Sequence, residues 1–435
     1  MVGDLSDRSG SIIRSDRRAF LKTGFAATGM VGLAGCVGDG ANDGGTTGDT
    51  DGGVDEVVIG SNHPLSGYLA FDGQRMDKAV RLAAKLKNDD GGIESLDGAE
   101  VKVVSGDNEA AQEQGGPVHE QLIDEGAHVL TGCYTSPTTT AAAQVAEQEQ
   151  IPFAVTVAAN DDAVTDDMQY SWRGQPTSTK HGIEYVRLMS DIIDKANLDV
   201  DTIGFFYVNN SYGQSVSQAI KDRSDELGLE VVADTAYELG ASNVDTQATK
   251  LKDADPDIVC PTTYAVGTKT LMDAFESIGY SPDYWAAAAQ ITFMNDEMVR
   301  QIGQRANGAL SLNYVASGAD SRVQELQGMF KTEFASDFDR EISMDGAHFM
   351  GFTMAELAIE CVERAGSVDP DDINEEFANI EFEDHLMAMD PITFDDTQEN
   401  ANAGDAVAQV QNLQPKIVYP EEFAGSEIQD PFAFE

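Results

Sequence analysis

A hydroxyl-rich stretch, Thr135-Ser136-Pro137, follows an apolar segment at 128–134 that predicts a buried strand. Serine is a common N-cap and proline is favoured at the first helical position, so we expect Ser136 to cap a helix over 138–149. The Ser136 hydroxyl and the free N–H groups of such a helix start could together bind an anion, for example a carboxylate. A cap without a ligand is the alternative, and the local pattern leaves both open.

The elements that would position this serine alternate between strand and helix. Such alternation predicts an α/β fold of mainly parallel sheets with helices on both faces, and ligands bind such sheets at the carboxyl ends of the strands. The last part of the chain differs, with helices followed by short strands. The expected strands are 57–61, 101–104, 128–134, 152–157, 202–208, 229–235, 258–264, 284–289, 309–315, 391–394, 406–413 and 416–419. The expected helices are 72–88, 109–125, 138–149, 179–196, 212–227, 245–253, 268–278, 322–335, 346–365 and 371–380.

The charge of the chain narrows its functions. Its 435 residues include 76 Asp and Glu against 27 Lys and Arg, a formal charge of −49, and the acids are spread along the whole chain. Such a surface repels nucleic acids and anionic headgroups, so we exclude nucleic-acid binding. We expect adaptation to molar salt, where the Debye length is about 3 Å and self-repulsion is screened. An unusually acidic protein from ordinary salt is the alternative.

The amino terminus has the pattern of an export signal. Arg17-Arg18 precedes an apolar run at 24–37 that is too short to span a bilayer, and it resembles a twin-arginine signal. The run contains Leu33-Ala34-Gly35-Cys36, which resembles a lipobox with Cys36 as the lipidated residue. We therefore expect residues 1–36 to be a lipoprotein signal and the Gly/Asp/Thr-rich residues 37–55 a flexible tether.

Residues typical of catalysis are not grouped in this sequence. It has no P-loop, H-E-x-x-H, C-x-x-C or nucleophile-elbow motif, so we expect no enzyme, no metal site and no cofactor. The six histidines lack ligand spacing, and we expect each to lie at the surface or in a satisfied core. Cys133, Cys260 and Cys361 lie in apolar settings and predict buried thiols rather than disulfides.

Several ordered motifs resemble one family over about residues 57–420. They are Pro64-Leu65-Ser66-Gly67, 88–93, 132–136, Tyr212-Gly213-Gln214, Asp255-Pro256-Asp257 and Val418-Tyr419-Pro420. The chain is similar to substrate-binding lipoproteins of branched-chain-amino-acid-type ABC importers, which have the type I periplasmic-binding fold. The resemblance implies two lobes joined by three crossovers, near 173–177, 310–314 and 387–392, and a hinge motion that closes them. Residues 56–176 and 312–388 would form lobe 1, and 177–311 and 389–422 lobe 2.

The resemblance also implies a ligand site in the cleft. Ser136 matches a serine that holds the ligand carboxylate, Ala158 and Asn160 match a loop that supplies a backbone group and a hydroxyl, and Tyr264 matches an aromatic that contacts the ligand. Asn160 stands where threonine is usual. The remaining expected neighbours of the cleft are Phe71, Asp72, Tyr134 and Tyr212.

One departure from the family leaves the ligand class open. Many amino-acid binders place a carboxylate within the stretch matching 285–290, where it pairs with the ligand ammonium; this chain has alanines and Gln290. A buried ammonium without a counter-charge is costly, so either Asp72 supplies the charge or the ligand has no ammonium. The stretch 132–136 also resembles that of amide- and urea-binding relatives. Amino acids, short amides or urea, and small carboxylates all remain open.

The resemblance implies a binding protein that delivers a small polar solute to ABC permease and ATPase subunits. We expect a monomer, lipid-anchored at the extracellular face of the membrane in a cell that lacks a periplasm. A ligand-sensing receptor with the same fold is the alternative.

Overall fold

A computed structural model describes residues 53–429 of the chain. Arg17, Arg18, Cys36 and most of the expected tether lie outside this range. The export and lipidation hypotheses therefore stay predictions. Among residues 53–429, no helix combines the length and the apolar character that crossing a membrane requires.

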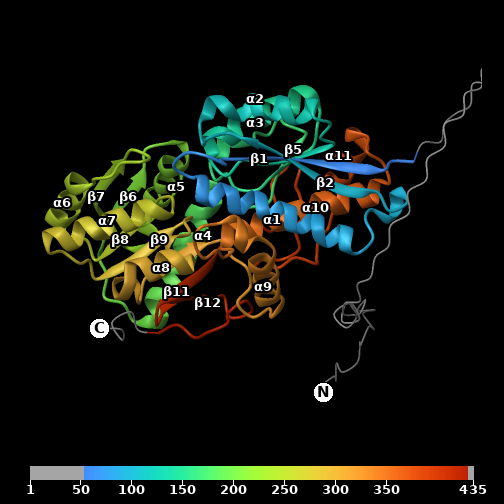
Figure 1. Cartoon of the computed structure of the whole chain (residues 1–435). Helices are drawn as coiled ribbons and strands as arrows, with labels where there is room; N and C mark the ends of the chain where they lie inside the picture. Colours follow the sequence, from blue (N-terminus) through green and yellow to red (C-terminus); the bar gives the residue numbers. More distant parts are fainter. Residues whose placement is uncertain (1–52, 430–435) are drawn as a thin grey trace, which may run out of the picture. The chain divides into compact units, whose positions relative to one another are not determined.

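The amino-terminal half of the described chain forms a five-stranded, wholly parallel sheet (Figure 1). The strand order is β2-β1-β3-β4-β5, so β1 lies between the two strands that follow it in the sequence. Parallel neighbours require crossover connections, and helices supply most of them. The strands are β1 Glu56–His63, β2 Glu100–Asp107, β3 Val129–Gly132, β4 Phe153–Val155 and β5 Ser171–Arg173.

Both faces of this sheet are covered by helices, which explains why its strands are apolar on both sides. Val57 and Ile59 belong to the core that includes α1, α10 and α11, whereas Val58 belongs to the core that includes α2 and α3. Adjacent side chains of β1 thus enter opposite layers, as strand geometry dictates. The helices are α1 Ala70–Asp89, α2 Gln112–Asp124, α3 Ser136–Glu149, α10 Gly346–Ala365 and α11 Pro370–Asn379.

The second sheet has seven strands in the order β12-β11-β10-β9-β8-β6-β7. Strands β6 to β10 pair in parallel, whereas β11 and β12 are antiparallel additions from the end of the chain. Its strands are β6 Thr202–Val208, β7 Glu230–Tyr237, β8 Ile258–Thr262, β9 Tyr284–Ala288, β10 Leu310–Asn313, β11 Ala406–Gln411 and β12 Gln414–Tyr419. Its helices are α4 Ser178–Ala196, α5 Ser211–Lys221, α6 Asp245–Ala254, α7 Ala265–Ile278 and α8 Asp296–Ile302.

Three segments connect the two sheets, and they hydrogen-bond to one another. The first runs from β5 to α4, the second follows β10 toward α9 (Arg322–Phe334), and the third precedes β11. Asn400 N–H in the third segment donates to Arg173 O at 3.0 Å, and Ala388 N–H donates to Val315 O in the second at 2.7 Å. These bonds hold the crossovers together. The residue limits of two lobes remain a prediction.

The structure confirms the α/β class with two mainly parallel sheets, and it corrects several elements. The helix expected from residue 109 begins at Gln112, because Glu109 and Ala110 have positive φ angles of 54° and 58°. The helix expected over 212–227 ends at Lys221 and is followed by a short 3-10 helix. Residues 391–394 form only isolated bridges rather than a strand. Strand β5 and helix α8 were not expected.

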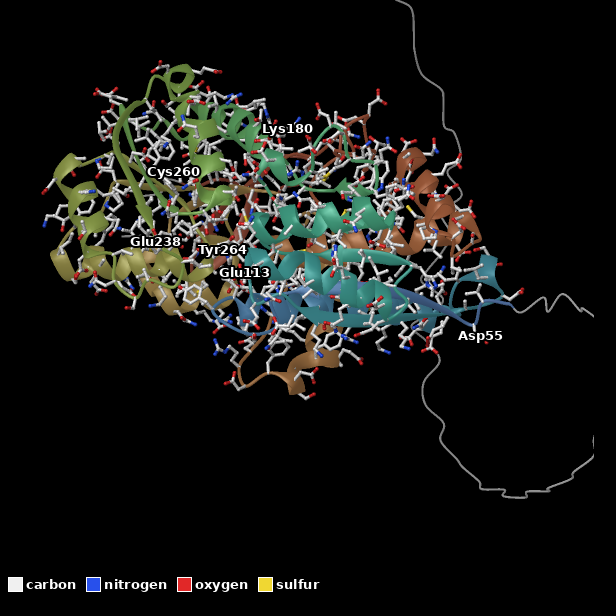
Figure 2. All side chains as sticks on the ribbon, turned by 90° about the horizontal axis from the view of Figure 1, so that it is seen from above. Asp55, Glu113, Lys180, Glu238, Cys260 and Tyr264 are labelled. Atoms are coloured by element: carbon white, nitrogen blue, oxygen red, sulfur yellow. The ribbon has the colours of Figure 1, made fainter. Side chains whose placement is uncertain are left out.

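Acidic side chains occur over both sheet layers, as the exposed Glu113 and Glu238 illustrate (Figure 2). The three cysteines within residues 53–429 are free and buried, which confirms the prediction that they do not form disulfides. Burial raises the pKa of the Cys260 thiol to about 12, so it is an unreactive protonated group.

Candidate functional site

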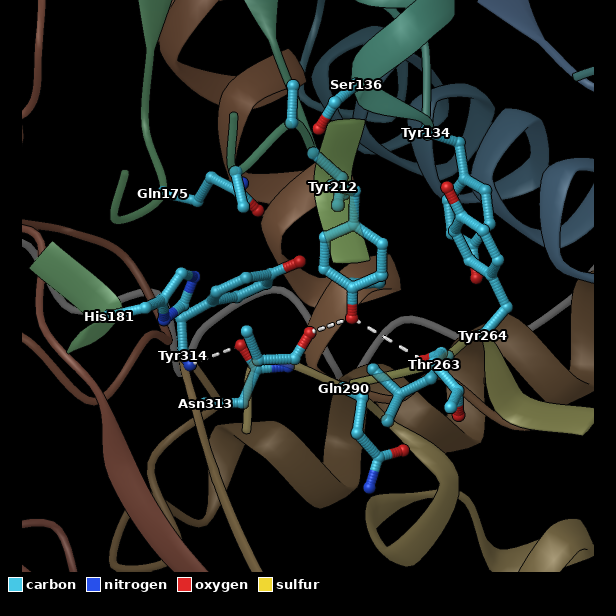
Figure 3. Close-up of a pocket in the computed structure, with 16 residues that line it drawn as sticks. Tyr134, Ser136, Gln175, His181, Tyr212, Thr263, Tyr264, Gln290, Asn313 and Tyr314 are labelled. Atoms are coloured by element: carbon cyan, nitrogen blue, oxygen red, sulfur yellow. Dashed lines mark hydrogen bonds between the residues drawn. The ribbon is translucent and has the colours of Figure 1, made fainter. Parts of the chain in front are cut away.

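A cavity of about 40 Å³ lies where the carboxyl ends of the parallel strands of both sheets meet (Figure 3). This is the region where open α/β sheets bind ligands. One water molecule needs roughly 10–15 Å³ measured in this way, so the cavity would hold a few waters and must widen to admit a solute. It is lined by Tyr134, Ser136, Val157, Ala158, Ala159, Gln175, His181, Tyr212, Thr263, Tyr264, Ala289, Gln290, Ile291, Asn313, Tyr314 and Ala347.

The cap of α3 differs from the prediction. Thr135, not Ser136, has the extended N-cap conformation, and its Oγ1 accepts from Thr138 N–H at 3.4 Å. Ser136 is therefore the first residue of the helix and Pro137 the second. The Ser136 Oγ accepts instead from Asn160 N–H at 3.2 Å and lines the cavity. The serine hydroxyl is thus free of the capping role that the sequence had suggested.

The turn between β3 and α3 places Tyr134 in the cavity through an unusual backbone. Gly132 has a φ of 145°, and a Cβ there would lie 2.2 Å from Asn62 O, so only glycine fits. Tyr134 itself has a φ of 85°, and Ala289 on the opposite sheet has a φ of 49°. Residues other than glycine rarely have positive φ angles, and those that do cluster at ligand sites.

Arg173 fixes the loop that carries Ala158 and Asn160. Its guanidinium is fully buried and donates to Ala158 O at 2.9 Å and to Asn160 O at 2.6 Å. It also pairs with Glu399 in the third connection. Ala158 lines the cavity, whereas Asn160 contributes its backbone N–H to Ser136 and its Nδ2 to Ser211 O at 3.4 Å. Asn160 thus supports the site from behind rather than lining it.

Aromatic rings form one side of the cavity. The ring centroids of Tyr134 and Tyr264 are 6.1 Å apart, and those of Tyr212 and Tyr264 are 5.3 Å apart. Tyr212 OH donates to Ala289 O at 2.6 Å. Burial raises the pKa of all three phenols, so they are neutral. This side offers apolar ring surface to a ligand.

Phe71 and Asp72, two expected neighbours of the cleft, do not line the cavity. Phe71 packs edge-on against Phe338 and beneath the guanidinium of Arg75. Asp72 forms an ion pair with that same Arg75, which is buried. The Asp72 carboxylate is therefore already neutralised outside the cavity.

Gln290 lines the cavity, and only the oxygen of its side-chain amide is hydrogen-bonded, since Nε2 is buried without a partner among residues 53–429. Its Oε1 accepts from Thr292 N–H at 2.5 Å, and its backbone carbonyl accepts from Ser311 Oγ at 3.0 Å. Figure 3 shows the side chain directed away from the ring of Tyr212. The two acceptor oxygens of Gln290 already accept hydrogen bonds, so Gln290 does not offer a free acceptor to a ligand ammonium.

Ten lining residues were not predicted, and four of them carry polar groups near the connections: Gln175, His181, Asn313 and Tyr314. Gln175 follows β5, His181 lies in the first turns of α4, Asn313 ends β10 and Tyr314 comes directly after it. All four thus lie at or beside the connections between the sheets. The resemblance had located two of these connections near 173–177 and 310–314, and polar residues there are the signal that could have found them.

These features define a class of protein, an α/β binding protein with a small-molecule cavity between two sheets. Residues 56–414 match the family model described as "Periplasmic binding protein", and the chain belongs to this family. Members of this family are extracytoplasmic solute-binding proteins rather than enzymes. Within residues 53–429, no group of three or more His, Cys, Asp or Glu side chains could hold a metal ion.

Individual relatives are distant. A Leu/Ile/Val-binding protein homologue of Brucella abortus is 27% identical over 231 residues, which cover 52% of this chain and 56% of the relative. The structure of a branched-chain amino acid binding protein of Streptococcus pneumoniae with isoleucine has a TM-score of 0.69 and 19% identity, over 84% of this chain and 100% of that one. A solute-binding protein of Rhodopseudomonas palustris with 3,4-dihydroxybenzoic acid has a TM-score of 0.68 and 20% identity, over 82% and 93%. These structures confirm the type I periplasmic-binding fold.

Proposed function

We propose that this protein captures a small amino acid with an apolar side chain, such as a branched-chain amino acid, and delivers it to the permease of an ABC importer. The observation that supports this most is the two-sided cavity. Figure 3 shows Tyr134 and Tyr264 at one side and Gln175 and His181 at the other. A solute with an apolar side chain and a charged backbone end fits such a division.

Ser136 supplies the oxygen-binding end of the proposed site. Its hydroxyl lies at the start of α3, where the helix dipole favours a carboxylate. Tyr134, Tyr212 and Tyr264 would cover the side chain, and the Ala158 loop, held by Arg173, would contact the ligand backbone. Opening and closing about the three connections would admit and release the solute.

The proposal extends to the cell surface. The twin-arginine pattern at Arg17-Arg18 and the lipobox at Cys36 support export and lipid anchoring at the outer face of the membrane. A monomer docked onto permease and ATPase subunits would complete the importer. The acidic surface supports the proposal that the protein functions at high salt. The binding assays should therefore be done in high-salt buffer.

Ligand titration tests the proposal directly. The purified chain in high salt is screened by thermal shift with the twenty common amino acids, urea, short amides and small carboxylates. A ligand at one hundred times its Kd stabilises the folded state by about 2.7 kcal/mol, which a melting curve resolves. We expect leucine, isoleucine or valine to give the largest shift. A shift with amides or simple carboxylates but with no amino acid would reject the amino-acid proposal.

A further inference from the structure

His181 and Asp405 form a buried pair beside the cavity. The His181 Nδ1 lies 2.7 Å from Asp405 Oδ2, and each side chain is only 1% exposed. The two residues are 224 positions apart and come from α4 and from the connection before β11. Because a carboxylate can only accept, the imidazole donates its Nδ1 proton to Asp405.

The pair keeps unused hydrogen-bonding atoms. His181 Nε2 and Asp405 Oδ1 are buried and have no partner among residues 53–429. In the neutral imidazole that donates from Nδ1, Nε2 carries a lone pair and accepts. His181 lines the cavity, and so does Gln175, whose Oε1 is also buried without a partner within the same residues. Figure 3 shows both side chains at the same side of the cavity. These two free acceptors lie on the side of the cavity away from Tyr134 and Tyr264, next to Tyr314, whose ring centroid is 6.2 Å from that of His181.

The distribution of charged residues around the cavity suggests what these acceptors bind. No Asp, Glu, Lys or Arg is among the lining residues of the described chain. An ammonium enclosed there would lack a direct counter-ion, and such a buried charge is costly. Asp345 also lies near the cavity, next to the lining residue Ala347, but Arg75 and His348 already share its charge. Within the described part of the chain, the Asp405 carboxylate has a hydrogen bond to His181 alone.

We infer that neutral His181 accepts a hydrogen bond at Nε2 from the ligand's ammonium, and that Asp405 behind it supplies the counter-charge. The pair takes the place of the carboxylate that other amino-acid binders put in the cavity wall. Gln175 provides a second acceptor for the same ammonium. This inference rests on the proposed function, since it requires an amino-acid ligand.

The test compares ligands with and without the amino group. Leucine, isoleucine and valine are each paired with the 2-hydroxy acid of the same skeleton, and calorimetric titration at pH 8 in high salt gives the Kd values of the full chain. A hydrogen bond to a charged group is worth about 1.5–3 kcal/mol, so we expect roughly a ten- to hundredfold preference for the amino acid. Asp405→Asn and His181→Gln should remove this preference, because the amino acid should lose more affinity than the uncharged 2-hydroxy group does.

A matched control separates this effect from the loss of any carboxylate. Asp234 pairs with Lys221 at 2.9 Å on the exposed face of β7, and Asp234→Asn should keep the wild-type preference. Equal preference in wild type and Asp405→Asn would overturn the inference. An equal loss of both ligands in Asp405→Asn would also overturn it, because that is the result of a structural role. Wild-type protein that binds none of the amino acids would overturn the proposed function as well, which distinguishes the two failures.

Discussion

Two buried histidine–carboxylate pairs have the same geometry and different surroundings. His348 Nδ1 lies 2.7 Å from Asp345 Oδ1, and His181 Nδ1 lies 2.7 Å from Asp405 Oδ2. All four side chains are excluded from solvent. The pairs differ in what the remaining polar atoms contact, and this difference separates a structural pair from one that can bind a ligand.

The Asp345 pair is saturated. Asp345 caps α10 by accepting from Ala347 N–H at 3.2 Å, and its other oxygen accepts from Asn295 Nδ2 at 3.0 Å. His348 Nε2 lies 3.3 Å from Asp72 O, so both ring nitrogens have a hydrogen-bond partner. Because Asn295 caps α8 and Asp345 caps α10, the pair also joins elements of the two sheets. Nothing in it is left for a ligand.

The Asp405 pair is half used: among residues 53–429, His181 Nε2 and Asp405 Oδ1 have no partner, and His181 lines a cavity. Buried polar groups are normally hydrogen-bonded, so an unpaired one next to a cavity indicates a role in binding. The comparison therefore predicts that changes at Asp345 affect stability and that changes at Asp405 affect ligand choice.

The largest effect should come from Asp345→Ala. It removes the carboxylate that faces Arg75 and His348, the cap of α10 and the bond to Asn295, while Arg75 keeps its ion pair with Asp72. Removing one member of a buried ion-pair cluster costs about 3–5 kcal/mol, and urea unfolding in high salt at pH 7 should show a loss of that size. A loss below about 1 kcal/mol would mean that the saturated pair is not structural, since surface changes give values that small.

The pKa of Asp345 predicts how this contribution depends on pH. Burial alone would raise the pKa, but His348 and Arg75 outweigh it and hold the pKa below its ordinary value. A carboxyl with a lowered pKa in the folded state stabilises the protein above its unfolded pKa and loses that contribution as the pH falls through the folded value. The difference between wild type and Asp345→Ala should therefore shrink only in strong acid.

A second prediction concerns a buried histidine without a carboxylate. His119 is fully buried against Ala142 O and the ring of Phe153, and burial lowers its pKa to about 4. The unfolded chain binds the proton near pH 6.5, so stability is full above that pH and falls as the pH drops toward 4. His119→Asn keeps an N–H donor but does not titrate. Urea unfolding at pH 7 and pH 4.5 should show an acid-induced loss smaller by up to about 3 kcal/mol in this variant. An identical loss in both proteins would show that His119 does not titrate as a buried neutral group.

The cavity and the two histidine pairs show which features could be predicted from the sequence and which could not. The strand–helix alternation predicted the sheets. The resemblance predicted six residues that line the cavity in the structure: Tyr134, Ser136, Ala158, Tyr212, Tyr264 and Gln290. Their contacts with a ligand remain a prediction. His181 was expected to be an ordinary histidine, because its partner Asp405 is 224 residues away and only the fold brings them together. Phe71 and Asp72 failed to reach the cavity because Arg75 and Phe338 hold them. Local spacing carries no information about such long-range partners.

The sequence also could not show which of two adjacent hydroxyl residues caps α3, since both Thr135 and Ser136 can cap a helix. The structure divides the roles: Thr135 accepts from Thr138 N–H, and Ser136 accepts from Asn160 N–H beside the cavity. Thr135 is thus comparable to the saturated Asp345 pair. Ser136 is comparable to the half-used Asp405 pair, because the Ser136 O–H can still donate to a ligand.

The smallest expected effect tests this division. Thr135→Ala removes the cap and should cost about 1 kcal/mol of stability while leaving the Kd for leucine unchanged. Its matched variant, Ser136→Ala, keeps the cap and should weaken leucine binding by roughly ten- to a hundredfold, because a hydrogen bond to the ligand carboxylate is lost. Urea unfolding and calorimetric titration of both variants give the four values. If Ser136→Ala bound leucine as tightly as wild type, the serine would only brace the Asn160 loop, and the carboxylate would have to bind elsewhere in the cavity.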